Sequence, residues 1–235
     1  MAKNDYSDTT VIIPTFNEEA NILSLIKSIE KSYPKIEIII SDDGSKDSTQ
    51  EIVKKHHLVN KHEHLFNRKN EPVHGLTISI IDAAKIVKTK NIVVMDGDFQ
   101  HPPAKINDFV KKLNSGFDLA IGTRNEITED WAWYRKLMSD VATDLGKVRL
   151  FLHGVSVKDP MSGFFAVKTD LFKRVIHDDE RKFEFRGYKV LFDLLKYIPK
   201  KTLISYVYYD FGMRKGGESK IGMRHVVAYF DSLFK

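Results

Sequence analysis

Two aspartates and a glutamine that follow an apolar run form the pattern with the clearest chemistry. Asp96, Asp98 and Gln100 come directly after Ile92 to Met95, which reads as a buried strand. Carboxylate and amide oxygens are the ligands that Mg²⁺ and Mn²⁺ prefer, and these ions leave positions open for diphosphate oxygens. A simple turn is the alternative, since Asp-Gly-Asp is common in loops. The place at a strand end favours a metal site, with Asp98 as a partly exposed ligand.

Two more polar clusters follow apolar runs in the same way. They are Thr15 to Glu18 and Asp42 to Ser45. The adjacent carboxylates of Asp42 and Asp43 can accept hydrogen bonds from a nucleobase or a ribose. The structural alternatives are a capping box for the first cluster, and a tight turn with a helix cap near residues 47–48 for the second.

The elements that position these clusters alternate regularly in the first half of the chain. Apolar runs predict strands at residues 11–13, 36–40, 92–95 and 119–121. Helical spacing or start signals predict helices over residues 18–31, from Ser48, over residues 78–86, and from Pro102-Pro103. Continuous apolar strands alternating with helices predict an α/β fold with a mostly parallel sheet covered on both faces. Ligands of such sheets bind at the carboxyl ends of the strands, so the three clusters should converge there.

The second half carries an amphipathic segment from Trp131 to Leu152. Its apolar stripe consists of Tyr134, Leu137, Met138, Val141, Leu145, Val148 and Leu152, with cations among them. Aromatic residues at one end and cations along the helix suit a membrane interface, and a core-packing helix is the alternative. Residues 196–224 add seven Lys and Arg against two carboxylates, which favours an anionic partner.

Composition excludes several classes of protein. The 235 residues contain no cysteine, so disulfides, cysteine-bound zinc and a catalytic thiol are ruled out. The sequence lacks both the Gly-rich phosphate loop and an apolar run of about 18 residues, and its N-terminus is too polar for a secretory signal. We therefore expect an intracellular protein that does not cross a membrane by itself.

His56, His57, His62 and His64 are expected in a solvated polar loop, with metal binding as the less favoured reading.

Seven short stretches, in order, resemble family 2 glycosyltransferases of GT-A fold, in particular the group that acts on polyprenyl phosphates. They extend over about residues 10–222 and are Val11–Glu18, Ile40–Asp47, Val94–Pro103, Ile121–Arg124, Asp159–Gly163, Gly187–Lys189 and Arg214–Lys220. The resemblance implies one GT-A domain over residues 1–235. Residues 1–125 would form the nucleotide-sugar half, and residues 126–235 the acceptor half with helices at the membrane interface.

The resemblance also implies a role for each matching residue. The nucleotide positions are Pro14, Asn17, Glu18, Asp43 and Asp96. The metal positions are Asp96, Asp98 and Gln100. The positions that receive the acceptor phosphate are Arg124, Arg135, Ser162, Arg214 and Lys220. Of these, Asp98, Arg124 and Arg135 are expected around the reacting atoms, together with Asp159, which would position the acceptor.

The activity implied by the resemblance is inverting transfer of a hexose, with mannose from GDP-mannose as the leading case, to dolichyl or another polyprenyl phosphate. Mg²⁺ or Mn²⁺ would be the cofactor. Partners would be the nucleotide sugar, the lipid phosphate and a membrane surface, without nucleic acid, and the protein would lie peripherally on the cytoplasmic side. A membrane-anchoring subunit, or a transmembrane segment missing from this chain, is the alternative to docking through amphipathic helices.

One departure from the family pattern bears on the donor. After Gly75 the chain runs Leu76 to Ile80, where the family usually has a second glycine and small residues. UDP-glucose therefore stays open as a donor, and a soluble sugar acceptor is a further alternative. A nucleic-acid-binding module is disfavoured because an acidic edge repels phosphates unless a metal intervenes. An inactive scaffold is disfavoured by the intact acidic and basic motifs.

Overall fold

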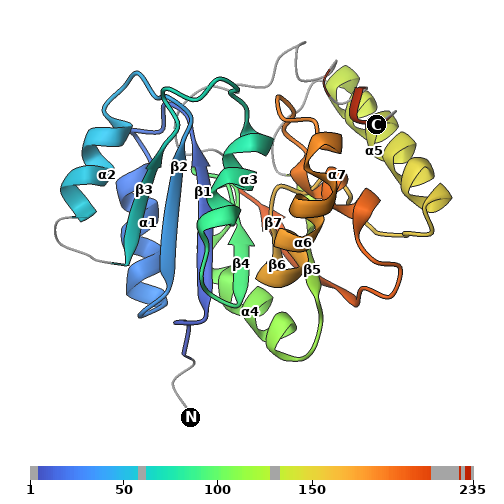
Figure 1. Ribbon diagram of the computed structural model, residues 1–235, viewed down its shortest axis with the longest axis horizontal. Coiled ribbons are helices and arrows are strands. Elements are labelled where there is room, and N and C mark those ends of the chain that lie inside the picture. The colour runs from blue at the N-terminus through green and yellow to red at the C-terminus, as the bar shows by residue number, and fades with distance from the viewer. Residues whose placement is uncertain (1–4, 58–61, 128–132, 213–227, 229–230, 234–235) are drawn as a thin grey trace.

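The computed structural model describes residues 5–57, 62–127, 133–212, 228 and 231–233 (Figure 1). Its strands are β1 (Thr9–Thr15), β2 (Glu37–Asp42), β3 (Glu63–Asn67), β4 (Asn91–Val94), β5 (Leu119–Ile127), β6 (Phe165–Lys168) and β7 (Ile204–Phe211). Its helices are α1 (Ile22–Ser32), α2 (Thr49–His57), α3 (Leu76–Ile86), α4 (Ile106–Asn114), α5 (Trp133–Leu152), α6 (Thr169–Asp179) and α7 (Val190–Tyr197), with short 3-10 turns η1 (Pro103–Lys105) and η2 (Glu180–Lys182).

One seven-stranded sheet runs through both halves of the chain, in the order β3-β2-β1-β4-β6-β5-β7. The pairs β1–β2, β1–β4, β2–β3 and β5–β7 are parallel. β6 lies antiparallel between β4 and β5. The prediction of a mostly parallel α/β sheet flanked by helices is therefore confirmed.

Helices cover both faces of the sheet, because successive strand residues point to opposite sides. Val11 and Ile13 of β1 pack with the buried faces of α1 and α4. Ile12, between them, packs with α3, α6 and α7 on the other side. The continuous apolar strands predicted from the sequence are thus the middle layer of three.

The sequence patterns missed the elements of the second half other than the amphipathic helix, and one edge strand. β6, α6, α7 and β7 were not predicted, and α1 begins at Ile22, four residues later than expected. The histidines predicted in a loop instead belong to regular elements or their edge: His56 and His57 end α2, and His64 lies in β3. β3 is polar because it is an edge strand that buries little of its surface.

The amphipathic segment forms α5, of which the structure describes the side chains from residue 143 onward. There, Leu145, Val148 and Leu152 of the predicted stripe are exposed, and the buried residues are Gly146 and Leu150. The core-packing alternative is therefore wrong for these three residues. Within the described part of the chain, helices long and apolar enough to span a bilayer are absent.

Candidate active site

Both carboxylate oxygens of Asp42 accept hydrogen bonds from other groups of the protein. It is buried at the end of β2, where Oδ1 accepts hydrogen bonds from the backbone amides of Gly44 and Ser45. Oδ2 accepts from the Thr15 hydroxyl at 3.1 Å and from the Ser45 hydroxyl at 2.5 Å. Asp42 therefore fixes the turn, as in the structural reading of this cluster, and ties the end of β2 to the end of β1.

Asp43 is held at the mouth of the sheet by a buried arginine. Arg68, 1% exposed, donates to Asp43 Oδ1 at 2.5 Å and forms an ion pair with Asp82 at 3.0 Å. The amide of Gly75 donates to Asp43 Oδ2 at 2.7 Å, and His74 lies 3.0 Å from Oδ1. The proposed nucleotide residue thus has a fixed orientation, and sequence reasoning missed the arginine that fixes it.

The loop after β1 lies beside this turn. Pro14 is buried inside β1, and Asn17 adopts a left-handed backbone with φ 55°. The Asn17 side chain accepts a hydrogen bond from the amide of Lys46 at 2.8 Å, and the Glu18 amide donates to the Thr49 hydroxyl at 2.8 Å. A helix cap at Thr15 is wrong, because these contacts join two loops before α1 begins. They bring the predicted nucleotide residues of both loops together.

The acidic loop after β4 places its two aspartates in different surroundings. Asp98 is 4% exposed, and its Oδ1 accepts a hydrogen bond from the Gln100 amide at 3.1 Å. The Asp96 side chain is 36% exposed. The expectation of a partly exposed Asp98 is therefore wrong, and Asp96 is the aspartate that faces solvent. Gly97 lies next to the Glu18 side chain, which connects this loop to the first one.

His101 is a buried member of the acidic loop that sequence reasoning did not single out. Its Nδ1 accepts a hydrogen bond from the Asp96 amide at 3.0 Å, and its ring stacks on Phe164. Burial lowers its pKa to about 3, with Arg124 and Lys189 lowering it further and Asp98 opposing them. His101 is therefore neutral at ordinary pH and adds no charge to the acidic loop.

Arg124 and Asp159 form an ion pair across the end of β5. Arg124 Nε donates to Asp159 Oδ2 at 3.2 Å, and the second guanidinium nitrogen lies at the same distance. Asp159 Oδ1 accepts from the Met161 amide at 3.1 Å, and the guanidinium also lies over the Phe211 ring. Both Asp159 oxygens are therefore engaged within the protein, and the carboxylate fixes the orientation of the Arg124 side chain.

Ser162 and Gly163 form the turn that leads into β6. The Ser162 hydroxyl is buried and donates to the Phe164 carbonyl at 3.0 Å. A Cβ on Gly163 would lie 3.2 Å from His101 Cε1 and 3.4 Å from Asp96 Oδ2. The absence of a side chain thus lets this turn lie directly against the acidic loop.

Lys189 is a second cation near the acidic loop, and its side chain is half-buried. Its ammonium donates to the Met161 carbonyl at 2.8 Å, next to the turn that Asp159 holds. Burial and the neighbouring Arg124 lower its pKa to about 8, while Asp159 and Asp96 raise it. The Gly187–Lys189 motif pointed to this position, but a role for the lysine could not be assigned from the sequence.

The end of β7 is tied to the acidic loop as well. The Gly212 amide donates to the Gln100 carbonyl at 3.2 Å, and Gln100 Nε2 lies 3.5 Å from the Gly212 carbonyl. Arg214 and Lys220, from the predicted acceptor set, lie outside the described residues. Arg135 is placed in α5 by its backbone, and its side chain lies outside the described part.

The departure from the family pattern at Leu76 has a structural counterpart at the start of α3. The first amides of this helix, at Thr77 and Ile78, donate to the carbonyls of Gly187 and Phe185. A Cβ on Gly75 would lie 2.5 Å from the Phe185 carbonyl oxygen. Protein carbonyls therefore use these helix amides, which are not available to a phosphate.

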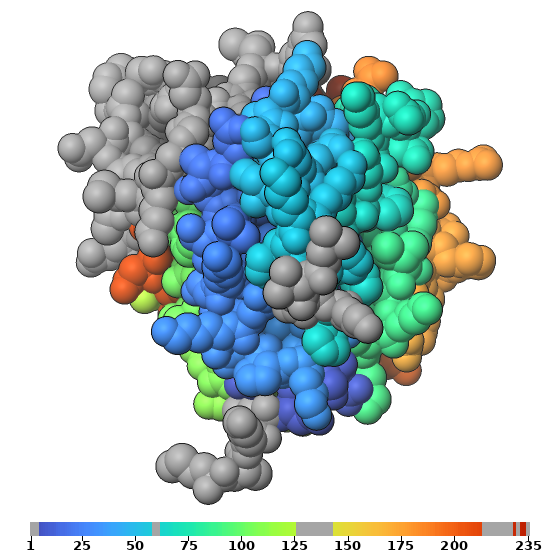
Figure 2. Space-filling view, turned by 90° about the vertical axis from the view of Figure 1, so that its left-hand side faces the viewer, coloured from blue at the N-terminus to red at the C-terminus, as the bar shows by residue number. Residues whose placement is uncertain are grey.

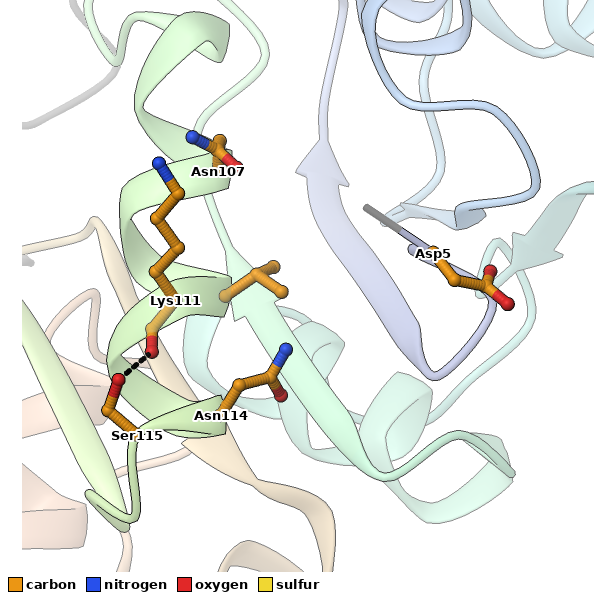
Figure 3. A pocket seen from close by; sticks show the side chains of 6 residues that line it. Asp5, Asn107, Lys111, Asn114 and Ser115 are labelled. Carbon is orange, nitrogen blue, oxygen red and sulfur yellow. Dashed lines mark hydrogen bonds between the residues drawn. The ribbon is translucent and has the colours of Figure 1, made fainter. Parts of the chain in front are cut away.

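Two other features lie at the opposite end of the strands. A pocket of about 350 Å³ opens between the N-terminal segment and α4 (Figure 3), lined by Asp5, Asn107, Val110, Lys111, Asn114 and Ser115. A group of three metal-ligand side chains, Glu30, His56 and Glu63, lies near the start of β3. Neither feature belongs to the cluster at the carboxyl ends of the strands.

Comparison with known proteins agrees with this arrangement. The family model for glycosyl transferase family 2 matches residues 10–176. A dolichol-phosphate mannosyltransferase of Pyrococcus furiosus is 32% identical over 96% of the chain, which spans 62% of that relative's length. One of Saccharomyces cerevisiae is 28% identical over 95% of the chain and 85% of the relative.

Solved structures of similar fold include glucosyl-3-phosphoglycerate synthase from Mycobacterium tuberculosis. The complex with Mn²⁺, UDP-glucose and phosphoglyceric acid matches with a TM-score of 0.68 and 19% identity, covering 96% of this chain and 79% of that one. Together with the family model, which covers more than half of the sequence, these findings show that the chain belongs to glycosyl transferase family 2.

Proposed function

We propose that the protein transfers mannose from GDP-mannose to dolichyl or another polyprenyl phosphate, with inversion at the sugar. The observation that carries this proposal is the gathering of cations beside the acidic loop: Arg124 pairs with Asp159, and Lys189 interacts electrostatically with Asp159 and Asp96. Such an arrangement suits the meeting of two phosphate groups. The names of the mannosyltransferase relatives support the same reaction.

The donor half of this proposal consists of residues 1–125. Asp43, fixed by Arg68, together with Asn17 and Glu18 would hold the nucleoside, with Pro14 shaping the loop. Asp96, Asp98 and Gln100 would hold Mg²⁺ or Mn²⁺, because they offer hard oxygen ligands and the neighbouring His101 stays neutral. When bound, the metal supplies positive charge to the leaving diphosphate.

The acceptor half, residues 126–235, supplies cations. A lipid phosphate is largely ionised at neutral pH, since the second pKa of such a group is about 6. Its oxygen can attack the anomeric carbon without a strong general base, forming a new carbon–oxygen bond as the bond to the nucleoside diphosphate breaks. Arg124, with Arg135, Ser162, Arg214 and Lys220, would receive the acceptor phosphate and offset the repulsion between two anions.

The acceptor also places the protein at a membrane, on the cytoplasmic side. Phe151 and Leu152 at the end of α5 are 73% and 75% exposed, and Val148 lies on the same helix. Exposed apolar residues of this size, close to the exposed Lys147, suit contact with acyl chains and anionic headgroups. Each cation near such a surface adds about 1 kcal/mol.

A transfer assay tests the proposal. The protein is incubated with labelled GDP-mannose and dolichyl phosphate in vesicles, and labelled lipid is extracted. Arg124→Ala should lose lipid labelling but still bind GDP-mannose, whereas Asp98→Asn should lose metal-dependent nucleotide binding. Lys111→Ala, an exposed cation on the far side of the sheet, is the matched control and should behave as the unmodified protein. If Arg124→Ala labels the lipid at the rate of the unmodified protein, Arg124 does not bind the acceptor phosphate.

The donor is separated from its alternative by a thermal-shift panel of GDP-mannose, UDP-glucose, GDP and UDP, each with and without Mn²⁺. A ligand at 100 times its dissociation constant stabilises the fold by about 2.7 kcal/mol. A guanine-selective, metal-dependent shift supports GDP-mannose. A uridine-selective shift keeps the fold and mechanism and moves the donor to UDP-glucose.

A further inference from the structure

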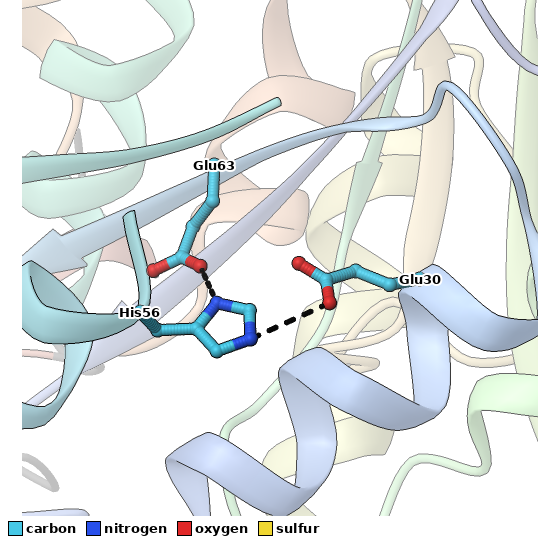
Figure 4. A group of neighbouring side chains, drawn as sticks. All are labelled: Glu30, His56 and Glu63. Carbon is cyan, nitrogen blue, oxygen red and sulfur yellow. Dashed lines mark hydrogen bonds and ion pairs between the residues drawn. The ribbon is translucent and has the colours of Figure 1, made fainter. Parts of the chain in front are cut away.

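Three ligand-type side chains from three different elements meet near the start of β3 (Figure 4). Glu30 comes from α1, His56 from α2 and Glu63 from β3. His56 Nδ1 lies 2.5 Å from Glu63 Oε2, and His56 Nε2 lies 3.6 Å from Glu30 Oε2. One ligand atom from each residue lies within 4.8 Å of the other two.

The burial of Glu63 is the second observation at this place. Its side chain is 0% exposed, and Oε1 has no hydrogen-bond partner among the described residues. A buried carboxylate without compensation is costly, and such groups are normally paired or coordinate metals. The single contact to His56 occupies Oε2 only, so the other oxygen of this carboxylate lacks a compensating group within the described part of the chain.

We propose that Glu30, His56 and Glu63 bind one divalent cation of the Zn²⁺ type. Two carboxylates and a neutral imidazole carry a charge of −2, which a divalent ion balances. Imidazole nitrogen with carboxylate oxygens is a common donor set for Zn²⁺. The three residues supply three ligands, and water completes the fourth position.

Side-chain rotations are needed to reach this state, because the two glutamates contact different nitrogens of the His56 ring. Tetrahedral coordination with bonds of about 2.1 Å separates neighbouring ligand atoms by roughly 3.4 Å. With one ligand atom taken from each residue, the three atoms lie within 4.8 Å of one another, which is somewhat wider than this value. In Figure 4, Glu63 meets the Nδ1 edge of the His56 ring and Glu30 meets the Nε2 edge, so one carboxylate has to turn along the ring to reach an ion bound by the other nitrogen.

This site is separate from the metal proposed for transfer. Glu63 is the first residue of β3, whereas Asp96 and Asp98 follow the last residues of β4, at the other end of the parallel strands. The cation would join α1, α2 and the edge strand β3 on the side of the molecule that Figure 2 presents. Its role is therefore to stabilise the edge of the nucleotide half, and the proposal does not depend on the sugar or the acceptor.

A neighbouring cluster provides the matched control. His62 and His64 each contact Glu37, at 2.8 Å and 3.2 Å, and both histidine side chains are about half exposed. This cluster has the same chemical types a few residues away, but it is solvated. A double variant, His62→Asn with His64→Asn, removes surface imidazoles without touching the buried group.

The test is a titration of the whole protein with ZnCl₂, with MgCl₂ in excess to occupy hard-ligand sites. Affinity is measured by calorimetry, and Co²⁺ is used as a spectroscopic probe of the coordination. Glu63→Gln and Glu30→Gln should each weaken Zn²⁺ binding by about tenfold or more, while the His62/His64 double variant changes it by less than about twofold. Glu30→Gln leaves the buried carboxylate in place, so the result does not depend on how well Glu63→Gln folds.

A thermal-shift series separates this site from the transfer site. Zn²⁺ should raise the melting temperature of the unmodified protein and of Asp98→Asn, but not that of Glu30→Gln. Equal Zn²⁺ affinity in Glu30→Gln and the unmodified protein would overturn the proposal. Loss of Zn²⁺ binding in the His62/His64 double variant, with both glutamate variants unaffected, would assign the ion to the surface cluster instead.

Discussion

Single charged residues at the mouth of the sheet are fixed by protein partners before any ligand arrives. Arg68 holds Asp43, and Asp159 holds Arg124. Side chains held in this way keep their orientation without losing rotamer freedom when a ligand binds. Preorganised charges of this kind are worth more than mobile ones, because no reorganisation accompanies the reaction.

The role of Asp159 can be separated from general-base catalysis. We predict that Asp159→Asn lowers kcat/KM for transfer by roughly 10- to 100-fold, since a hydrogen bond to a charged group contributes about 1.5–3 kcal/mol. The shape of the pH profile between about pH 6 and 8 should stay the same, because an ionised acceptor needs no base. Disappearance of the acidic limb of the profile in this variant would instead identify Asp159 as the base.

His101 makes a pH-dependent contribution to stability. Its pKa is lowered from 6.5 to about 3 by burial, so below pH 6.5 the unfolded chain binds a proton that the folded protein does not. Acidification therefore favours unfolding, by about 1.4 kcal/mol per pH unit well below pH 6.5. His101→Asn keeps an acceptor for the Asp96 amide but does not titrate.

The prediction is tested by denaturant unfolding of both proteins from pH 7.5 to 4.5. The stability difference, unmodified protein minus His101→Asn, should fall steadily as the pH drops below about 6.5 and stay constant above it. Parallel stability curves for the two proteins would show that His101 does not titrate as its burial implies.

At the scale of elements, hydrophobic periodicity predicted the buried strands and one of the helices that cover them. β1, β2 and β4 and the helix α3 appear where continuous apolar runs or helical spacing placed them. β3 was missed because it is an edge strand with few apolar residues, and even its buried first residue, Glu63, is charged. α1 was started too early because residues 15–21 form loop contacts instead. Arg68, His101 and Lys189 could not be placed from the sequence, since the surroundings of each side chain depend on contacts between elements distant in the chain.

The entrance to α3 gives an element-scale prediction. Gly75 has φ 154°, and an added Cβ would lie 2.5 Å from the Phe185 carbonyl oxygen. Gly75→Ala should therefore lower the free energy of unfolding by roughly 2–4 kcal/mol, from backbone strain plus displacement of the 183–188 segment. Gly116→Ala is the control: its φ is 97°, but nothing lies within 4 Å of the added atom.

Urea unfolding measures the free energy of unfolding of the two variants and tests this prediction. Gly116→Ala should cost only about 1 kcal/mol, for backbone conformation alone. Equal losses for both variants would mean that the segment after η2 moves away from Gly75 without appreciable cost.

At the scale of the molecule, one sheet joins the proposed donor and acceptor halves. β6 comes from the second half but lies between β4 and β5 of the first. The acidic loop after β4 and the turn before β6 are consequently held at a fixed separation by adjacent strands. Outside the sheet, the end of α5 presents large apolar side chains to solvent.

That exposed surface leads to a binding prediction. We expect Phe151→Ser with Leu152→Ser to weaken binding to vesicles containing anionic lipid by about tenfold or more, because each side chain loses on the order of 1.5–3 kcal/mol of burial. Leu203→Ser is the control, since this residue is 57% exposed but lies outside α5, just before β7. Vesicle sedimentation measures the membrane affinity of the unmodified protein, the double variant and the Leu203 variant. If the double variant binds vesicles as tightly as the unmodified protein, the end of α5 does not contact the membrane.

Hydrogen bonds at Gly212 and at residues 232–233 hold two late points of the chain to elements that are distant in the sequence. Gly212 is bonded to Gln100, while Lys196 donates to the Ser232 carbonyl and Arg149 to the Leu233 carbonyl. Lys196 is itself buried and also pairs with Asp193 at 2.8 Å. The end of the described chain is therefore anchored on a charged group inside the protein, and removing the Lys196 ammonium would leave both the Asp193 carboxylate and the Ser232 carbonyl without this partner.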